Sequence, residues 1–310
     1  MLRLALCTCA VGLVLLLFNF WLSQSIQRTS TQISSNEERH FNDTLAKLLI
    51  PRWPGSRGHS LVCDFLIEEL RTLGFVATRD EFSDTFPLTN VVGVLNPNAK
   101  QFLLLSCHYD SKYLETTHRY VGATNGAVSC AILLNMAKKL NSLFRDEFGR
   151  NHIGLLLVFF DAHDSVNGIT DNTYPLMGSK SFVRAETMPL NRISLVISFN
   201  LIGAPDQIYM SRYERTYYLH ERLVDIEEDL RASAQLDPCH QLFYKLKDHD
   251  SDIDDDHYSF LAKGLPVMHV LPHTYPDVWL QESDNLQNLH WPTVRNMNTI
   301  ITRFVYEYLN

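Results

Sequence analysis

The sequence predicts an α/β fold: a central mixed, mostly parallel β-sheet with helices on both faces, in one domain. Three observations indicate this class. Short apolar, β-rich runs alternate along the chain with longer helix-like segments. The runs are apolar on both faces, which is typical of strands covered by helices on either side. The chain of 310 residues is 45% hydrophobic and 20% charged, which suffices to bury a full core.

The predicted elements follow one another in a regular order. Strands are predicted for the apolar runs at 90–95, 101–107, 154–160, 193–199 and 265–271. Apolar residues recur at helical spacing in the segments predicted as helices, which are 59–73, 126–142, 216–235 and 293–309. The sequence shows no internal repeat and, after the N-terminal segment, no second region of different amino-acid composition. The globular part is therefore predicted to be a single domain over residues 40–310.

The N-terminus differs in kind from the rest. An apolar run from Leu4 to Leu22 is close to the ~20 residues that span a bilayer. Residues 1–25 are predicted to be a signal-anchor or a signal peptide, and the length of the run favours the anchor. Residues 26–39 are polar, which predicts a short stalk. A sequon begins at Asn42, so we expect a glycan there and a domain that lies in the secretory lumen.

Charge and cysteine content narrow the range of partners. The net charge of −8 and the lack of any basic block argue against a nucleic-acid partner. Six cysteines are present without a C-x-x-C pair, which argues against a zinc ribbon or a redox motif. The acidic run "DHDSDIDDDH" at 248–257 lacks the Gly and the terminal Glu of a calcium-binding loop, and we expect a solvated loop that precedes Asp255.

Polar residues follow the predicted strands where each one ends. "HYDSKY" follows 101–107, "DAHDS" follows 154–160, "NLIGAP" follows 193–199 and "PHTYPDVW" follows 265–271. Ligands of open α/β sheets bind beyond the carboxyl ends of the strands. The sequence therefore predicts a site at one rim of the sheet, where carboxylates and imidazoles could bind a metal or transfer a proton.

Seven segments in order resemble the glutaminyl-peptide cyclotransferases, which share the fold of the M28-type zinc aminopeptidases. They are "LLIPRWPGSRG", "LLSCHYDSKY", "VGATNGAVSCAILLNMAKKL", "VFFDAHDS", "NLIGAPD", "DDDHYSFLAKGLPVMHVLP" and "YPDVWLQESDN", and they run from residue 48 to near the C-terminus. The resemblance implies one zinc ion that polarises the side-chain amide of an N-terminal Gln. A carboxylate then moves a proton from the N-terminal amine to the leaving ammonia, and pyroglutamate forms.

This chain departs from the family pattern at the zinc-ligand positions. The resemblance places an aspartate ligand at Asn125, a glutamate ligand at Asp164 and a histidine ligand at Leu280. A neutral amide is a poor zinc ligand, and a leucine side chain cannot bind a metal. Only Asp164 is retained as a ligand, one methylene shorter. We therefore expect zinc to bind weakly or not at all.

The proton-transfer positions implied by the resemblance are changed as well. The family's acid/base glutamate matches His163, and one aspartate of its proton relay matches Asn200. The second relay aspartate is retained as Asp255. A histidine can act as a base, so His163 is either a replacement base or a residue without a catalytic role. Asn200 cannot take up a proton, which favours the second interpretation.

Two further features come with the resemblance. Tyr275 and Trp279 match aromatic residues of the substrate pocket. Cys107 and Cys130 match a disulfide of the secreted family members. In a lumenal chain such a bond can form, so we expect Cys107 and Cys130 to be linked.

The sequence as a whole predicts a cyclotransferase-like protein that is catalytically inactive or impaired and binds the N-termini of peptides or proteins. The alternative is an active zinc-dependent cyclotransferase, or a metallohydrolase with a rebuilt site that includes His108 and Asp110. The N-terminal segment makes the membrane a second expected partner. We expect a type II Golgi membrane protein with a lumenal domain, and the alternative is a secreted protein.

Overall fold

The computed structural model of the chain describes residues 35–83, 87–144, 153–164, 176–250 and 253–310. The chain divides into two compact units, Met1–Asn42 and Asp43–Asn310. A helix covers residues 35–48, so the last residues of the predicted polar stalk are helical. The predicted membrane segment, residues 1–25, lies outside the described residues. Within the ranges given above, no helix is long and apolar enough to cross a membrane.

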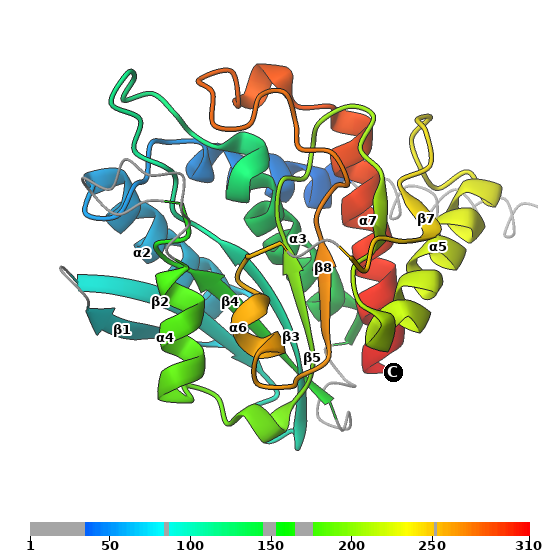
Figure 1. The fold of residues 1–310 in the computed structure, drawn as a ribbon, viewed down its shortest axis with the longest axis horizontal. Coiled ribbons are helices and arrows are strands. Elements are labelled where there is room, and N and C mark those ends of the chain that lie inside the picture. Colours follow the sequence, from blue (N-terminus) through cyan, green and yellow to red (C-terminus); the bar gives the residue numbers. More distant parts are fainter. Residues whose placement is uncertain (1–34, 84–86, 145–152, 165–175, 251–252) are drawn as a thin grey trace, which may run out of the picture. The chain divides into compact units, whose positions relative to one another are not determined.

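A six-stranded mixed sheet forms the centre of the second unit (Figure 1). Its order is β1-β2-β4-β3-β5-β8, with the bounds Val76–Ser83, Pro87–Leu95, Ile153–Phe160, Gln101–His108, Ile193–Phe199 and Val267–Val270. Strands β4, β3, β5 and β8 are parallel neighbours, whereas β2 pairs antiparallel with both β1 and β4. Each of the five predicted runs is a strand, so the predicted mixed, mostly parallel sheet is confirmed.

Four long helices match the predicted segments closely. They are α2, α3, α5 and α7, with the bounds Arg57–Thr72, Val128–Phe144, Tyr217–Ala232 and Trp291–Leu309. The start of α2 is fixed by Ser56, whose hydroxyl oxygen accepts the backbone N–H of His59 at 3.1 Å. The chain leaves α2 through Gly74, whose φ of 86° favours glycine.

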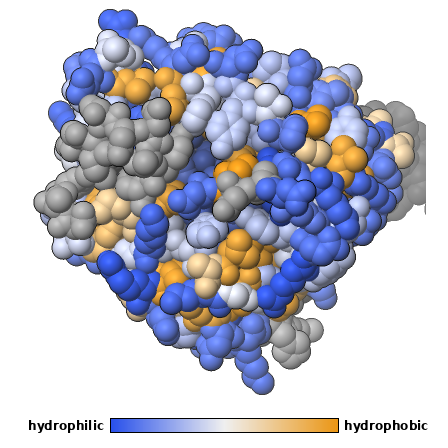
Figure 2. All heavy atoms as spheres, viewed as in Figure 1, coloured by the Kyte–Doolittle hydropathy of each residue, from blue (hydrophilic) through white to orange (hydrophobic). Residues whose placement is uncertain are grey.

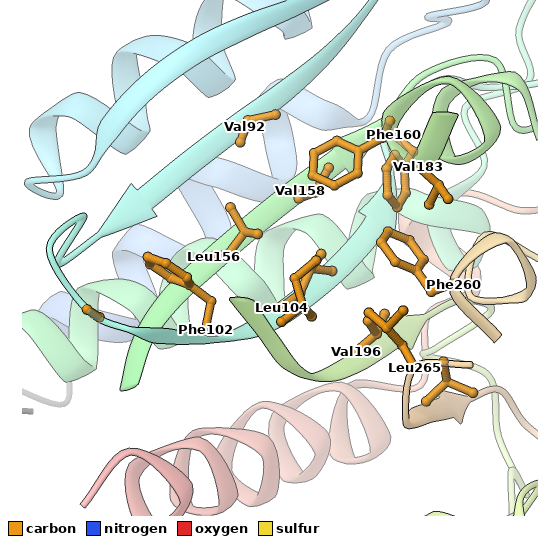
Figure 3. Close-up of a cluster of buried hydrophobic side chains, with 14 residues drawn as sticks. Val92, Phe102, Leu104, Leu156, Val158, Phe160, Val183, Val196, Phe260 and Leu265 are labelled. Atoms are coloured by element: carbon orange, nitrogen blue, oxygen red, sulfur yellow. The ribbon is translucent and has the colours of Figure 1, made fainter. Parts of the chain in front are cut away.

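One face of the sheet packs against two short helices, α4 (Met177–Ala185) and α6 (Tyr258–Leu261) (Figure 3). Residues two positions apart on β3 and β4 contribute to this cluster, among them Leu104, Leu156, Val158 and Phe160, and Val196 of β5 joins them. Phe182 and Val183 of α4 and Phe260 of α6 complete it. The strand residues between them are also buried, for example Leu103 and Leu157, because the opposite face is covered too.

The opposite face of the sheet is covered by longer helices. Gly93 of β2 faces Leu70 of α2, and a Cβ on Gly93 would lie 2.9 Å from a Leu70 methyl carbon. Its neighbour Val92 points into the cluster with α4. Helix α3 packs on β3 and on α7, and α5 packs on α7 (Figure 1). Hydrophilic residues cover most of the coloured surface in Figure 2.

Several elements do not appear among the sequence predictions. Strand β1, "VATRDEFS", is a polar edge strand that pairs only with β2, so it lacks an apolar run. Strands β6 (Tyr209–Ser211) and β7 (Phe243–Lys247) form a small separate sheet. Helices α4 and α6 are too short to show a clear helical period. The remaining helical turns are Ala123–Ala127, Leu190–Arg192, Glu214–Thr216 and Leu286–Asn288.

Candidate functional site

The candidate site lies at the rim formed by the carboxyl ends of the parallel strands. The strand register pairs His108, the last residue of β3, with Phe160, the last residue of β4. The backbone N–H of Asn200, just past β5, donates to the carbonyl oxygen of Val270 at the end of β8, at 3.2 Å. The segments after four strands therefore meet at one edge, as the sequence predicts. Their polar side chains are buried, namely those of His108, Asp110, His163, Asp164 and Asn200, and Asp255, which precedes β8, is buried beside them.

Asn125 enters the site on a π-helical turn, Ala123–Ala127, directly before α3. Gly126 has a φ of 93°, and a Cβ there would lie 2.7 Å from the carbonyl oxygen of His108, so the position requires glycine. The carboxylate of Asp284 accepts the backbone N–H groups of Thr124 at 2.7 Å and of Asn125 at 3.2 Å. This carboxylate fixes the turn and ties it to the loop that follows β8.

The side chain of Asn125 is hydrogen-bonded to that of Asp164. Its Nδ2 donates to Oδ2 of Asp164 and, at 3.1 Å, to the hydroxyl oxygen of Tyr120. The reverse orientation of the amide would set its oxygen against the carboxylate, so the observed orientation is the favourable one. Burial raises the pKa of Asp164, although His108 and His163 act to lower it. The side chains at two of the three positions where the resemblance places zinc ligands are therefore hydrogen-bonded to each other.

A tight turn after β4 directs His163 and Asp164 into the site. Ala162 has a φ of 53°, a left-handed conformation that costs a non-glycine residue about 1–2 kcal/mol. The carboxylate of Asp110 accepts the backbone N–H groups of His163 at 3.1 Å and of Asp164 at 3.0 Å. Burial raises the pKa of Asp110, but the hydrogen bond and charge of His108 outweigh it and bring the pKa to about 2. Asp110 is thus an ionised anchor of this turn.

His163 is paired with two carboxylates. Its Nδ1 lies 3.0 Å from Oδ2 of Asp256 and 3.7 Å from Oδ1 of Asp255. Burial lowers the pKa of His163, but the charges of Asp256 and Asp255 outweigh it and raise the pKa to about 10. An imidazolium has no lone pair with which to accept a proton. His163 is therefore not poised as a general base at neutral pH.

Asn200 connects two stacked imidazoles to Asp255. The rings of His108 and His163 stack with centroids 4.1 Å apart and an interplanar angle of 11°. Oδ1 of Asn200 lies 3.3 Å from Nε2 of His108. Its Nδ2 lies 3.4 Å from Nε2 of His163, but both atoms carry hydrogen when His163 is an imidazolium, so this contact is then not a hydrogen bond. The same Nδ2 donates to Oδ2 of Asp255 at 3.3 Å. Because an amide does not exchange its proton as an acid does, this link does not form a proton relay.

Asp255 remains a carboxylate. Its Oδ2 also lies 2.9 Å from Nε2 of His269, which comes from β8. Burial raises the pKa of Asp255, but His269 and His163 outweigh it and hold the pKa well below the ordinary value. The retained relay position is therefore ionised and held from two sides, by an imidazole and by the amide of Asn200.

The loop after β8 brings the predicted pocket residues beside this network. Tyr275 and Trp279 pack edge to face with ring centroids 4.7 Å apart, and both are half-buried. Burial and the charge of Asp255 raise the pKa of Tyr275, since the phenol lies near that carboxylate. Leu280 follows with a φ of 57° and is half-buried. Its side chain offers no ligand atom.

The side chains at the three positions where the resemblance places zinc ligands do not fit zinc. A catalytic zinc site needs three protein ligands and one open position. Here Asn125 offers an amide whose N–H is directed at Asp164, and Leu280 offers only carbon. One carboxylate, itself hydrogen-bonded, is left to bind the ion. No chemical step can therefore be assigned to a metal at these three positions.

The predicted disulfide is absent from the structure, in which Cys107 and Cys130 are free, buried thiols. Burial raises the pKa of Cys107 well above the usual value, and a hydrogen bond to Cys130 raises it further. Sγ of Cys130 donates to the carbonyl oxygen of His108 at 3.2 Å. The two thiols are neighbours, and oxidation to a disulfide stays a prediction.

The acidic loop that precedes Asp255 is half-buried or exposed at its described positions, 248–250 and 253–254, and the chain becomes buried at Asp255. Asp255 and Asp256 are 4% and 1% exposed, because they turn inward to His163 and His269. Asp248, at the start of the run, pairs with the buried side chain of Arg212 at 2.5 Å.

Sequence reasoning missed the residues that hold the site in shape. The guanidinium of Arg52 is fully buried, and its Nε donates to the carbonyl oxygen of Tyr109 at 2.6 Å. Its Nη2 lies 3.3 Å from the carbonyl oxygen of Gly122 and 3.4 Å from that of Asn125. Asp284 holds the same turn through its backbone N–H groups, and His269 holds Asp255. The sequence places none of them beside a site residue, so it carries no signal for these contacts.

Comparison with known proteins agrees with this geometry. The sequence model of Peptidase family M28 matches residues 90–305, which defines the class as an M28-type α/β domain. The glutaminyl-peptide cyclotransferase of Drosophila melanogaster is 32% identical over 295 residues, which cover 88% of this chain and 82% of the relative. The glutaminyl-peptide cyclotransferase-like protein of Bos taurus is 34% identical over 292 residues, 87% of this chain and 76% of the relative. The chain therefore belongs to the glutaminyl-peptide cyclotransferase family.

Solved structures share the fold. The crystal structure of Macrostomum lignano glutaminyl cyclase has a TM-score of 0.79 at 25% identity, over 87% of this chain and 89% of that chain. Porphyromonas gingivalis glutaminyl cyclase has a TM-score of 0.73 at 19% identity, over 88% of this chain and 98% of that chain.

Proposed function

We propose that the protein binds the N-termini of peptides or proteins and does not form pyroglutamate at an ordinary enzyme rate. The observation that supports this most directly is the hydrogen bond between Asn125 and Asp164. It occupies two positions at which the resemblance places zinc ligands, and Leu280 cannot replace the third. Without a Lewis acid at the side-chain carbonyl, the attack of the amine is not assisted.

Proton transfer is impaired for an independent reason. Cyclisation must move a proton from the N-terminal amine to the departing ammonia. His163 stands at the acid/base position as an imidazolium paired with Asp256, and Asn200 stands at one relay position. Loss of a general acid/base alone typically lowers a rate by ~10²–10⁴. Loss of both functions together leaves a binding site rather than a catalyst.

Features suited to binding an N-terminus are retained. Tyr275 and Trp279 form a half-buried aromatic pair, and the carboxylate of Asp255 lies near Tyr275. A protonated amine is attracted both by an aromatic face and by a nearby carboxylate. The α-ammonium group of a peptide is therefore the group that we expect this end of the site to recognise.

Binding and turnover can be measured on the same sample. The purified full-length chain is mixed with a peptide that begins with Gln, and binding is followed by calorimetry while ammonia release is assayed. We expect binding without ammonia. Trp279→Ala should weaken binding, whereas Tyr218→Ala, an aromatic residue that is 66% exposed, should not. Ammonia release at a rate typical of enzymes would contradict the proposal, as would equal binding by Trp279→Ala.

We further propose that the protein is a type II membrane protein whose domain lies in the lumen of the Golgi. The apolar run at 4–22 and the exposed sequon residue Asn42 support this. Protease treatment of intact vesicles should spare residues 40–310 until detergent is added. Digestion without detergent would show the opposite orientation.

A further inference from the structure

We propose that His163, Asp255 and Asp256 form a binding site for one divalent cation of the zinc class, distinct from the three zinc-ligand positions. One nitrogen and oxygens of two carboxylates lie within 4.8 Å of one another there. All three side chains are buried, with exposed fractions of 3%, 4% and 1%. The proposal goes beyond binding of N-termini and does not depend on it.

The distances suit a tetrahedral ion. Zinc lies about 2.0–2.2 Å from nitrogen and oxygen ligands, so ligand atoms of a tetrahedral site lie about 3.4 Å apart. Nδ1 of His163 is 3.0 Å from Oδ2 of Asp256 and 3.7 Å from Oδ1 of Asp255. These two distances bracket the tetrahedral value. An ion bound there would displace the hydrogen that Nδ1 carries in the metal-free site, so His163 would be a neutral ligand once the ion is bound.

One carboxylate oxygen of Asp256 is available to bind a cation. Its Oδ1 is buried and, among the described residues, has no hydrogen-bond partner. A buried carboxylate oxygen without a partner costs free energy, and a bound cation would remove that cost. Because Oδ2 of the same carboxylate faces His163, Oδ1 can add a second, longer contact from Asp256 to the proposed ion.

Asp255 is held in place by three contacts. Its Oδ1 accepts the backbone N–H of Asp256 at 2.6 Å, while its Oδ2 contacts His269 at 2.9 Å and Asn200 at 3.3 Å. Metal-binding carboxylates are commonly oriented by such outer hydrogen bonds. The ligand cluster therefore has the supporting contacts that a metal site needs.

A neighbouring cluster fits less well. Asp255, His257 and His269 also lie within 4.8 Å of one another. However, the rings of His257 and His269 stack with centroids 4.0 Å apart, and Nε2 of His257 is hydrogen-bonded to the hydroxyl of Tyr213. The lone pairs of imidazole lie in the ring plane, so two stacked rings do not point them at one ion. The cluster with His163 has a single ring and avoids this conflict.

The test measures zinc on the full-length chain without reference to activity. The protein is stripped with a chelator and titrated with Zn²⁺, and the bound zinc is quantified and examined by X-ray absorption. We expect one equivalent of zinc, with one imidazole and otherwise oxygen in its coordination shell. Asp256→Asn should lower the affinity at least ~10-fold, since changes even to outer contacts cost this much. Asp225→Asn, a surface carboxylate whose side chain is 43% exposed, should leave the affinity unchanged.

Several outcomes would overturn the site. One is the absence of stoichiometric zinc on the unmodified chain. Another is a coordination shell without an imidazole, which needs no variant and so holds even if Asp256→Asn fails to fold. A third is loss of zinc from Asp164→Asn but not from Asp256→Asn, which would move the ion to the zinc-ligand positions. None of these results depends on pyroglutamate formation, so the proposed function is tested separately.

Discussion

The amide of Asn125 donates a hydrogen bond to the carboxylate of Asp164, at two positions where related cyclotransferases are expected to bind zinc. In a zinc site two ligands are drawn together by the ion between them. Here the amide hydrogen takes that place, and both side chains are buried. The side chains at these two positions thus bind each other in place of an ion. The effect of single substitutions there can therefore be predicted.

Asn125→Asp should destabilise the chain when zinc is absent. The change replaces a hydrogen-bond donor with a second carboxylate opposite Asp164, so a buried polar contact is lost and like charges meet. We expect a decrease of ~1–3 kcal/mol in the free energy of unfolding, measured by denaturant titration with a chelator present. The double variant Asn125→Asp, Leu280→His should regain this stability when zinc is added. No loss in the single variant would show that the hydrogen bond is unimportant.

Ala162 should tolerate glycine and reject valine. Its φ of 53° is strained for any side chain, and most of all for a β-branched one. Ala162→Gly should change the free energy of unfolding by less than about 1 kcal/mol, because relief of strain offsets the greater freedom of the unfolded chain. Ala162→Val should cost more than ~1 kcal/mol, since the residue is also fully buried. Equal stability of the two variants would contradict the assigned conformation.

The ion pairs of His163 should stabilise the protein at low rather than at high pH. The pKa of His163 is raised from 6.5 to about 10 on folding by Asp256 and Asp255, against the effect of burial. The stabilisation is therefore complete below pH 6.5 and is lost as the pH rises through about 10. With a chelator present, the stability difference between the unmodified chain and His163→Gln should shrink over that range. A titration of His163 near 6.5, followed by NMR, would contradict the pairing.

Oxidation should link Cys107 to Cys130. The free thiols are buried neighbours, and closing a loop of ~23 residues would stabilise the domain by ~3 kcal/mol in the chain-entropy model. Peptide mapping without reduction, on protein from the secretory pathway, should recover the two cysteines in one linked pair. Cys63 and Cys239 provide the internal control, since we expect both to be recovered as thiols.

Much of the fold could be predicted because its central strands are buried on both faces. Runs such as "GLLLVFF" carry that burial in their composition, and β4 ends where the run ends. Strand β1 could not be predicted in this way, because the side chains of this edge strand are mostly exposed and several are charged. For the site, the residues after each strand were predictable, since parallel strands bring their carboxyl ends together. The contacts between side chains were not.

Three contacts illustrate that limit. Asp284 reaches the turn of Asn125 across 159 positions of sequence, and Arg52 reaches it across 73. Asp256 turns inward to His163 from a run that otherwise predicts solvent exposure. Such pairings depend on how loops fold over the rim, and neither periodicity nor spacing along the chain encodes them.

We propose that substituted side chains, and not the scaffold, prevent cyclisation. The most direct test compares pyroglutamate formation by the unmodified chain with that by a repaired chain carrying Asn125→Asp, Asp164→Glu, Leu280→His, His163→Glu and Asn200→Asp, both with zinc. A chain with only the first three changes is the control, which should bind zinc without turnover because it lacks the carboxylate relay. We expect product from the fully repaired chain alone. Product from the unmodified chain at a comparable rate would contradict the claim.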